Sequence, residues 1–205
     1  KENLASSLLY FTNWNLSQNF FDPMCGSGTF IIEAISKASG LPANFHPERE
    51  RKFSCDNFLK TSPFGKIDTK NLKKEAANSW LNACKLNSLP IIIGRDIDEN
   101  SINIAKKNSS YALPKHLSKF INWEIGPISS ATPPVLKNEK KGILVVNPPY
   151  GKRMQSNTEI EEKQINTQLG EMLKKRFLNW NAWVLSGRPN FISEIRLKPK
   201  NKIKV

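Results

Sequence analysis

Residues 20–30 have the sequence Phe20-Phe21-Asp22-Pro23-Met24-Cys25-Gly26-Ser27-Gly28-Thr29-Phe30. Two aromatic residues and an aspartate predict a short buried strand, the glycines predict a turn, and the apolar positions that continue through Ile35 predict a helix. A strand that passes through a glycine turn into a helix is typical of a nucleotide-type cradle, because the backbone can approach a ligand closely there. The alternative is a helix N-terminus whose small residues only permit tight packing.

The details of this cradle argue against phosphate-bearing ligands. Ile31 stands where the third glycine of a dinucleotide fingerprint would be, and no Gly-Lys-Ser/Thr sequence follows, as a phosphate loop requires. Asp22 would repel phosphate but attract an ammonium group. The predicted ligand therefore carries a cationic amino group, as S-adenosylmethionine does.

Residues 90–96, Pro-Ile-Ile-Ile-Gly-Arg-Asp, predict a second strand that ends in an acid. A carboxylate at the end of the second strand commonly binds ribose hydroxyls. Asp96 is therefore the candidate ribose ligand, and Ile97 is available to pack on adenine. Asp98 has the position of a helix N-cap. The alternative for Asp96 is a solvated aspartate at a strand end.

Residues 142–150, Gly-Ile-Leu-Val-Val-Asn-Pro-Pro-Tyr, predict a buried strand followed by a rigid turn. Two prolines lack N–H groups and hold φ at about −65°, so the carbonyl groups nearby are free to accept hydrogen bonds. Asn147 adds a side-chain carbonyl, Pro148 a backbone carbonyl and Tyr150 an aromatic face. This set suits a planar base with an exocyclic amino group. Taken alone, the tetrapeptide fits a Pro-rich turn about equally well.

With these three sites in this order, the chain resembles the class I S-adenosylmethionine-dependent N-methyltransferases. The specific resemblance is to the RNA methylase family that includes the bacterial large-subunit ribosomal RNA guanine-N2 methyltransferases of the RlmL type. The motifs that carry it span nearly the whole chain: Lys1–Ala5, Asp22–Thr29, Gly94–Asp98 and Asn147–Arg153. The resemblance implies a doubly wound, mostly parallel α/β sheet of the Rossmann-like type.

The resemblance also implies an activity and roles for individual residues. The expected enzyme is an S-adenosylmethionine-dependent N-methyltransferase that acts on an exocyclic base nitrogen in RNA, with guanine N2 of large-subunit rRNA as the target. No metal is expected. The implied cofactor contacts are Asp22, Gly26, Gly28 and Asp96, and Cys25, Thr29 and Ile97 are further candidate cofactor contacts. The implied catalytic contacts to the target amine are Asn147, Pro148 and Tyr150, and Lys152 and Arg153 are expected to hold a neighbouring phosphate of the substrate.

The chain departs from the family pattern after the third predicted strand. Family members usually carry an acid there to meet the adenine amino group, whereas residues 123–130 read Trp-Glu-Ile-Gly-Pro-Ile-Ser-Ser. Ser129, Ser130 or a backbone carbonyl is the expected substitute. Lys152 stands where the RlmL type more often has glutamate, so the loop beyond the catalytic motif is more cationic here.

Three alternative functions stay open. A DNA adenine or cytosine N-methyltransferase would use the same Asn-Pro-Pro-Tyr chemistry, and so would a protein-glutamine methyltransferase. A non-catalytic RNA-binding or assembly module with a degenerate cofactor pocket is the alternative from a different class, and it is motivated by the missing acid.

Composition is consistent with one α/β domain over residues 1–205. The chain has 205 residues, of which 39% are hydrophobic, enough for one substantial core. Its net charge of +13 favours a polyanionic partner such as RNA. Its three cysteines have neither zinc-site nor disulfide-framework spacing. No stretch resembles a membrane span or a signal peptide, so a cytoplasmic protein is expected. The chain is expected to be truncated at both ends, without the RNA-binding module that precedes this domain in the family.

Alternation of strands and helices organises the chain. An insertion at about 40–89 is expected to carry a helix at 70–86, and Phe45, Phe53, Phe58 and Phe64 are expected to form a satellite core. His46 and His116 are interpreted as packing or surface residues, since neither has a partner at metal-ligand spacing. The predicted strands are 19–22, 91–96, 119–125, 143–147, 180–185 and a sixth that begins at 198. The other predicted helices are 4–11, 29–39, 99–110, 165–177 and 189–197.

Overall fold

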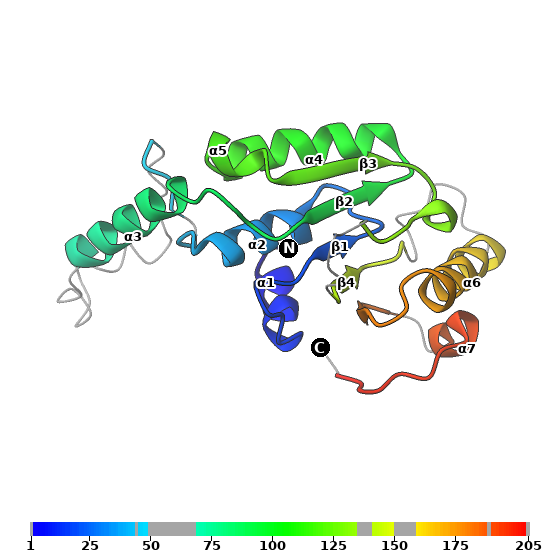
Figure 1. Cartoon of the computed structure of the whole chain (residues 1–205). Coiled ribbons are helices and arrows are strands. Elements are labelled where there is room, and N and C mark those ends of the chain that lie inside the picture. The colour runs from blue at the N-terminus through cyan, green and yellow to red at the C-terminus, as the bar shows by residue number, and fades with distance from the viewer. Residues whose placement is uncertain are drawn as a thin grey trace, which may run out of the picture.

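The computed structural model of the chain describes residues 2–43, 45–48, 69–134, 141–149, 159–187 and 190–203. Five strands and the helices around them make up this part of the chain (Figure 1). The strands are β1 (Phe20–Asp22), β2 (Ile92–Asp96), β3 (Ile121–Ile125), β4 (Ile143–Val146) and β5 (Asn181–Val184). The helices are α1 (Glu2–Phe11), α2 (Thr29–Ser39), α3 (Thr69–Cys84), α4 (Glu99–Ala112), α5 (Lys115–Ser118), α6 (Glu159–Lys175) and α7 (Phe191–Ile195), with a 3-10 turn, η3 (Ile128–Ser130).

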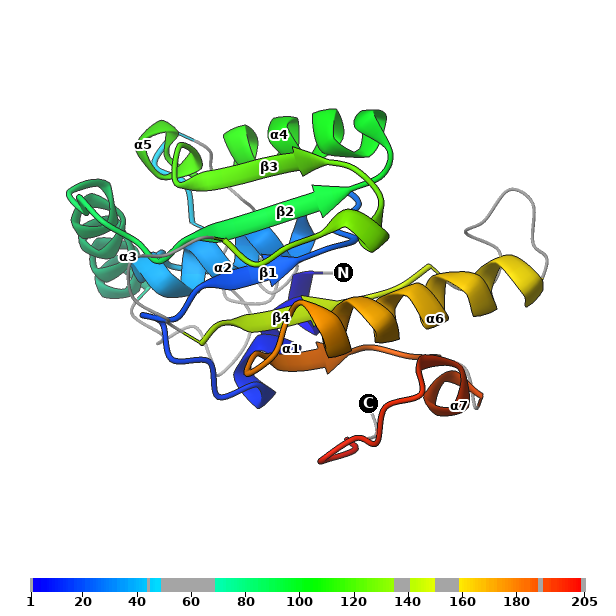
Figure 2. The ribbon, with the colours of Figure 1, turned by 45° about the vertical axis from the view of Figure 1, so that its right-hand side comes forward.

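The strands form one sheet in the order β3-β2-β1-β4-β5, and every pair is parallel. β1 lies at the centre, between β2 and β4, and Figure 2 shows the strands running in one direction. The chain therefore builds outward from β1 first on one side and then on the other. This is the doubly wound topology that the alternating pattern predicts, and it places the crevice for ligands at the carboxyl ends of the strands next to β1.

Neighbouring residues in each central strand enter different cores on the two faces of the sheet. Phe20 packs in a cluster with α1, α2 and α4, whereas Phe21 packs in a cluster with η3, α6 and α7. Both phenylalanine side chains are fully buried. Helices on both faces explain why these strands read as continuous apolar runs rather than alternating ones.

Most predicted elements are confirmed within a few residues. The helix at 29–39 has the predicted bounds, and α3 and β5 lie inside the predicted ranges to within one residue. α6 begins at Glu159, earlier than the apolar spacing indicates, because its first turn is polar. Its apolar positions Leu169, Met172 and Leu173 are buried in the core, as predicted.

The prediction of a sixth strand is wrong over the described residues 198–203, which have no strand structure. Pro199 lacks the backbone donor that a ladder needs, and Lys198, Lys200 and Lys202 are exposed. Two short elements, α5 and η3, were not predicted, since three or four residues carry too little periodicity. Among the described residues, no helix combines the length and the apolar character needed to cross a bilayer.

Only part of the proposed satellite core falls within the described residues. Phe45 and His46 both contact the Trp80 ring of α3, with centroids 6.2 and 4.8 Å away. His116 hydrogen-bonds the Leu86 carbonyl and packs edge-on against Phe120. The two histidines therefore have the packing role predicted for them. Phe53, Phe58 and Phe64 lie outside the described residues.

Candidate active site

The three motifs singled out in the sequence meet at the carboxyl edge of the sheet. Phe21 of β1 is in register with Leu144 of β4, and Asp22 is in register with Gly94 of β2. Because neighbouring parallel strands end at the same edge, the turn after Asp22, the acid at the end of β2 and the Asn-Pro-Pro segment after β4 leave the sheet side by side. This juxtaposition is the one on which the sequence interpretation depends, and it is confirmed.

The turn after β1 is held by hydrogen bonds to β2. The Cys25 N–H donates to the Arg95 carbonyl at 2.8 Å, and the Gly26 N–H donates to Asp96 Oδ2 at 2.8 Å. The Gly28 N–H closes the turn on the Cys25 carbonyl at 2.8 Å. The turn and the end of β2 are thus one rigid unit.

The two glycines of this turn have different surroundings. Gly26 has φ +51°, and a Cβ built there would meet nothing within 4 Å. Gly28 has φ +83°, and a Cβ there would lie 2.9 Å from Ala105 Cβ and 3.1 Å from the Trp123 ring. Both need the left-handed region that favours glycine. The open space beside Gly26 is available to a ligand, whereas Gly28 permits close packing of α2 against α4.

Asp22 is a buried carboxyl at the base of the turn, with 1% of its surface exposed. Burial raises its pKa from 3.8 to about 8, assisted by the nearby Asp96 charge and opposed by the Met24 N–H, which donates to Oδ1 at 3.1 Å. Burial, with the charges of Asp22 and Asp96, also raises the pKa of the Cys25 thiol far above its ordinary range. Cys25 therefore stays a neutral packing group. Asp22 is protonated at neutral pH, and a bound cation would favour its ionised form.

Asp96 lies at the end of β2 with both carboxylate oxygens already ordered. Oδ2 accepts from the Gly26 N–H, and Oδ1 accepts from the Asp98 N–H at 3.0 Å. Each oxygen keeps a further lone pair for a hydroxyl donor such as a ribose. Ile97 is 69% exposed beside it, an apolar surface without a partner in the described part of the chain. Asp98 caps α4 by accepting from the N–H groups of Asn100 and Ser101, as predicted.

Asn147 and Pro148 follow β4 directly and are partly and fully buried, respectively. The side-chain oxygen of Asn147, Oδ1, is inaccessible and has no hydrogen-bond partner; across the described residues, it shares this state only with Asn19 Nδ2 and Arg95 Nε. An unpaired buried acceptor costs free energy, and an N–H donor from a ligand would offset that cost. This atom has the chemistry to receive an N–H group. Tyr150, Lys152 and Arg153 lie outside the described residues.

The loop after β3 contains a feature that the sequence analysis missed. Arg95 of β2 reaches across to this loop: Nη1 pairs with Glu124 at 2.7 Å, and Nη2 donates to Ser130 Oγ at 2.6 Å and to the Pro127 carbonyl at 3.4 Å. Gly126, at φ +154°, leaves room for the guanidinium, which a Cβ there would strike. The cross-strand pairing of Arg95 with Glu124 could have been found only from the sheet register.

Thr29 begins α2 and is half-buried, with its hydroxyl 3.5 Å from that of Ser27. The Ser130 hydroxyl, expected as a partner for adenine, is engaged by Arg95 and donates to the Pro127 carbonyl at 3.1 Å. The Ser129 carbonyl accepts from Arg176, in the turn that follows α6. The Ser130 hydroxyl and the Ser129 carbonyl, two of the groups expected to replace the missing acid, are therefore already bonded within the protein.

The family model for the RMKL-like methyltransferase domain matches residues 1–205. The chain belongs to this family. Curated relatives include the ribosomal RNA large subunit methyltransferases K/L of Shewanella loihica and of Buchnera aphidicola, each 31% identical. They align with 100% and 98% of this chain, respectively, but with only 27% of their own length. The chain thus spans about a quarter of these relatives.

Solved structures show the same architecture. A predicted N6-adenine-specific DNA methylase from Listeria monocytogenes matches 100% of the chain and 48% of its own, with 27% identity and a TM-score of 0.74. SMU.472, a protein crystallised with SAH, matches 98% of the chain with a TM-score of 0.76, and at 24% identity this likeness concerns the fold alone. The fold is that of the Rossmann-like class I methyltransferases.

Proposed function

We propose that this chain is the catalytic domain of an S-adenosylmethionine-dependent methyltransferase that modifies an exocyclic base nitrogen in RNA, with guanine N2 of large-subunit rRNA as the target. The observation that carries the proposal is the buried, unpaired Oδ1 of Asn147 at the same sheet edge as Asp22 and Asp96. Membership of the RMKL-like family and the rRNA methyltransferase relatives support the substrate class.

The residues present fit this cofactor. Asp22 would face its cationic amino-acid portion, the open side of Gly26 would admit it, and Asp96 would bind its ribose, with Ile97 against adenine. Bound there, S-adenosylmethionine supplies an electrophilic methyl group on a sulfonium. SMU.472, which shares the fold, binds SAH. The turn after β1 would be shaped by the uncharged residues Cys25, Gly28 and Thr29, which would contact the cofactor without adding charge.

Asn147 and Pro148 would prepare the nucleophile. The amino group of guanine is a poor nucleophile because its lone pair is delocalised into the ring. Asn147 Oδ1 and the Pro148 carbonyl would accept its two N–H groups and direct the lone pair toward the methyl group, so transfer needs positioning rather than a strong base. One proton leaves the nitrogen for solvent once the C–N bond has formed. Tyr150 would stack on the base, and Lys152 and Arg153 would contact a neighbouring phosphate.

Substitution of Asn147 tests the proposal. We expect Asn147→Ala to abolish methylation while changing the affinity for S-adenosylmethionine less than about threefold, because the substitution removes an acceptor for the amine only. Asn181→Ala, on the edge strand β5, is the matched control. The readouts are calorimetry with S-adenosylmethionine and mass spectrometry of nucleosides from the rRNA of cells that carry each variant.

The results separate the alternatives. Loss of one N2-methylguanosine from rRNA supports the proposal. Loss of a methylated base from DNA instead would favour a DNA methyltransferase, the alternative that the name of the Listeria relative suggests. No binding of S-adenosylmethionine by the wild-type protein would favour the non-catalytic module.

A further inference from the structure

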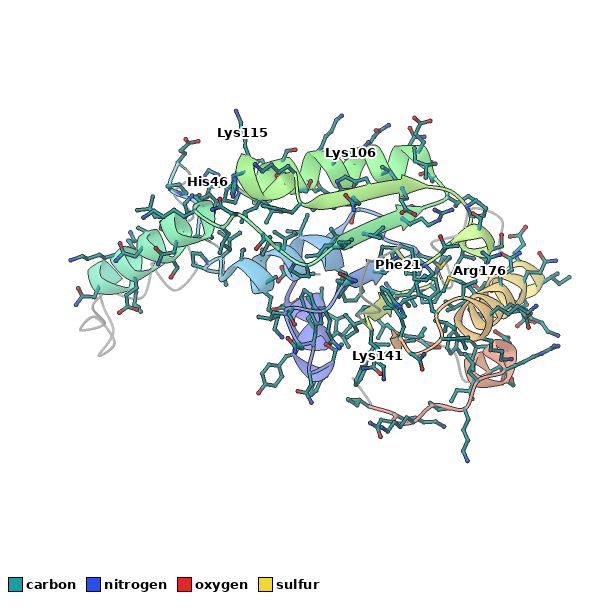
Figure 3. All side chains as sticks on the ribbon, in the orientation of Figure 1. Phe21, His46, Lys106, Lys115, Lys141 and Arg176 are labelled. Carbon is teal, nitrogen blue, oxygen red and sulfur yellow. The ribbon has the colours of Figure 1, made fainter. Side chains whose placement is uncertain are left out.

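A group of exposed lysines lies on α3, α4 and α5 and on the segment that follows α3. It comprises Lys73 and Lys74 of α3, Lys85 in the segment that follows α3, Lys106 and Lys107 of α4, and Lys115 and Lys119 at α5. We call this surface the basic face. α3 contacts α5, and α5 contacts α4, so the lysines belong to one continuous set of elements (Figure 1). Figure 3 shows Lys106 and Lys115 on this α4–α5 side.

The basic face has little acidic counterpart. Residues 100–123 contain four lysines and no aspartate or glutamate, and α3 contributes a single acid, Glu75. The two ion pairs formed within the described residues join Arg95 to Glu124 and Glu171 to Lys175, so neither involves the basic face. By contrast, α6 carries Glu159, Glu161, Glu162 and Glu171 among its basic residues. The α4–α5 part of the chain is therefore basic with few acids, and the exposed Lys198, Lys200 and Lys202 form a second basic segment near the C-terminus.

The basic face begins away from the candidate active site and runs toward it. α4 starts beside Asp96 at the carboxyl edge of the sheet and ends near α5, which precedes the start of β3 at the opposite edge. The 14 residues of α4 span ~21 Å. A ligand that reaches both places must extend about this far beyond the group that is methylated. A folded RNA does so, and a free nucleotide does not.

We propose that the basic face binds the phosphate backbone of the RNA substrate at a distance from the target base. The proposal rests on the proposed function and adds the surface that holds the rest of the RNA. Lysine contacts to phosphate are independent of sequence and release counterions, so they supply affinity rather than choice of nucleotide. The many exposed Asn and Ser side chains of α4, such as Asn103 and Ser110, are also common phosphate ligands.

A charge-neutral variant tests the basic face. In it, Lys106, Lys107, Lys115 and Lys119 are all changed to Gln, which keeps most of the side-chain stem, so the helices should stay folded. The matched control changes Lys174, Lys198, Lys200 and Lys202 to Gln, an equal loss of exposed charge elsewhere. The probe is a fluorescent RNA hairpin with a long stem, and its affinity for the full-length protein is measured by anisotropy over a series of salt concentrations.

We expect the basic-face variant to bind the hairpin at least about tenfold more weakly at low salt, with the slope of log K against log salt reduced by about 2 to 3. The control should change the slope by less than about 1. Unchanged affinity for S-adenosylmethionine and unchanged methylation of a short RNA that cannot span the molecule would show that the catalytic site is intact. If the proposed function is wrong, the wild-type protein itself will neither bind S-adenosylmethionine nor methylate the short RNA.

Equal effects of the two variants would overturn the proposal, since charge alone would then explain binding. So would a basic-face variant that loses affinity for phosphatidylglycerol vesicles but not for RNA, because the face would then serve a membrane.

Discussion

At the scale of single residues, Asp22 determines the pH response of the site. Its pKa rises from 3.8 to about 8 on burial, so between these values the folded chain holds a proton that the unfolded chain has released. The contribution of Asp22 to the free energy of unfolding should therefore be greatest below about pH 4 and fall as pH rises through this window, by up to ~1.4 kcal/mol per unit. Urea unfolding of the ligand-free protein across the window measures the slope, which Asp22→Asn should remove.

The same residue links pH to cofactor binding. A cationic ligand favours the ionised carboxylate, so binding below about pH 8 should release a proton from Asp22. We expect the affinity for S-adenosylmethionine to rise by up to about tenfold per pH unit as pH approaches 8, and Asp22→Asn to flatten this dependence. Calorimetry in two buffers of different ionisation enthalpy gives the number of protons released for each ligand bound. An equal pH dependence in wild type and variant would show that another group titrates.

At the scale of elements, the packing of α7 on α6 depends on one glycine. Gly170 lies in α6, and a Cβ there would collide with the Ile195 carbonyl oxygen of α7. In a free helix Gly→Ala would stabilise by up to ~1 kcal/mol. Here the clash should reverse the sign, so we expect Gly170→Ala to destabilise by about 1–3 kcal/mol and to raise hydrogen exchange in α7 first.

Glu171→Ala is the control for this prediction, because Glu171 is the next residue of the same helix and its ion pair with Lys175 is solvent-exposed. Exposed pairs contribute little, so its effect should stay below ~1 kcal/mol. A Gly170→Ala variant as stable as wild type would mean that α7 can move away without loss.

At the scale of the whole molecule, β1 joins the two cores into one cooperative unit. Phe20 packs against Trp14 with ring centroids 5.1 Å apart, and Phe21 stacks on Phe177 at 5.3 Å on the other face. Either Phe→Ala change should cost about 3–5 kcal/mol. Because the strand is shared, we expect far-UV circular dichroism and tryptophan fluorescence to report a single coincident transition in both variants.

Tyr10→Ala is the control, because the Tyr10 side chain is 75% exposed. This change should leave the midpoint of the unfolding transition nearly unchanged. Two separate transitions in Phe20→Ala or Phe21→Ala would show that the faces fold independently.

Local sequence was sufficient for most of the elements and for the positions of Asp22, Asp96 and Asn147 at or just after strand ends. The bounds of α2 and the cap at Asp98 could be predicted because Gly28, Gly40 and a capping carboxylate act on their own neighbours. The hydrogen bonds of Arg95 could not be predicted from its neighbours in sequence. Its partners, Glu124, Pro127 and Ser130, are about 30 residues away and are brought to it by strand register.

The residue order by itself determined the strand and helix pattern, the glycine turn after Asp22 and the polar residues that end three strands, because each depends on neighbours in sequence. Tertiary structure alone decided that those strand ends share one edge, that Asn147 Oδ1 is buried without a partner and that Gly26 is open while Gly28 is filled by Ala105. It also decided that the seven lysines of the basic face form one surface. Burial and contact between distant segments depend on how β1, β2 and β4 pair, and no local pattern contains that information.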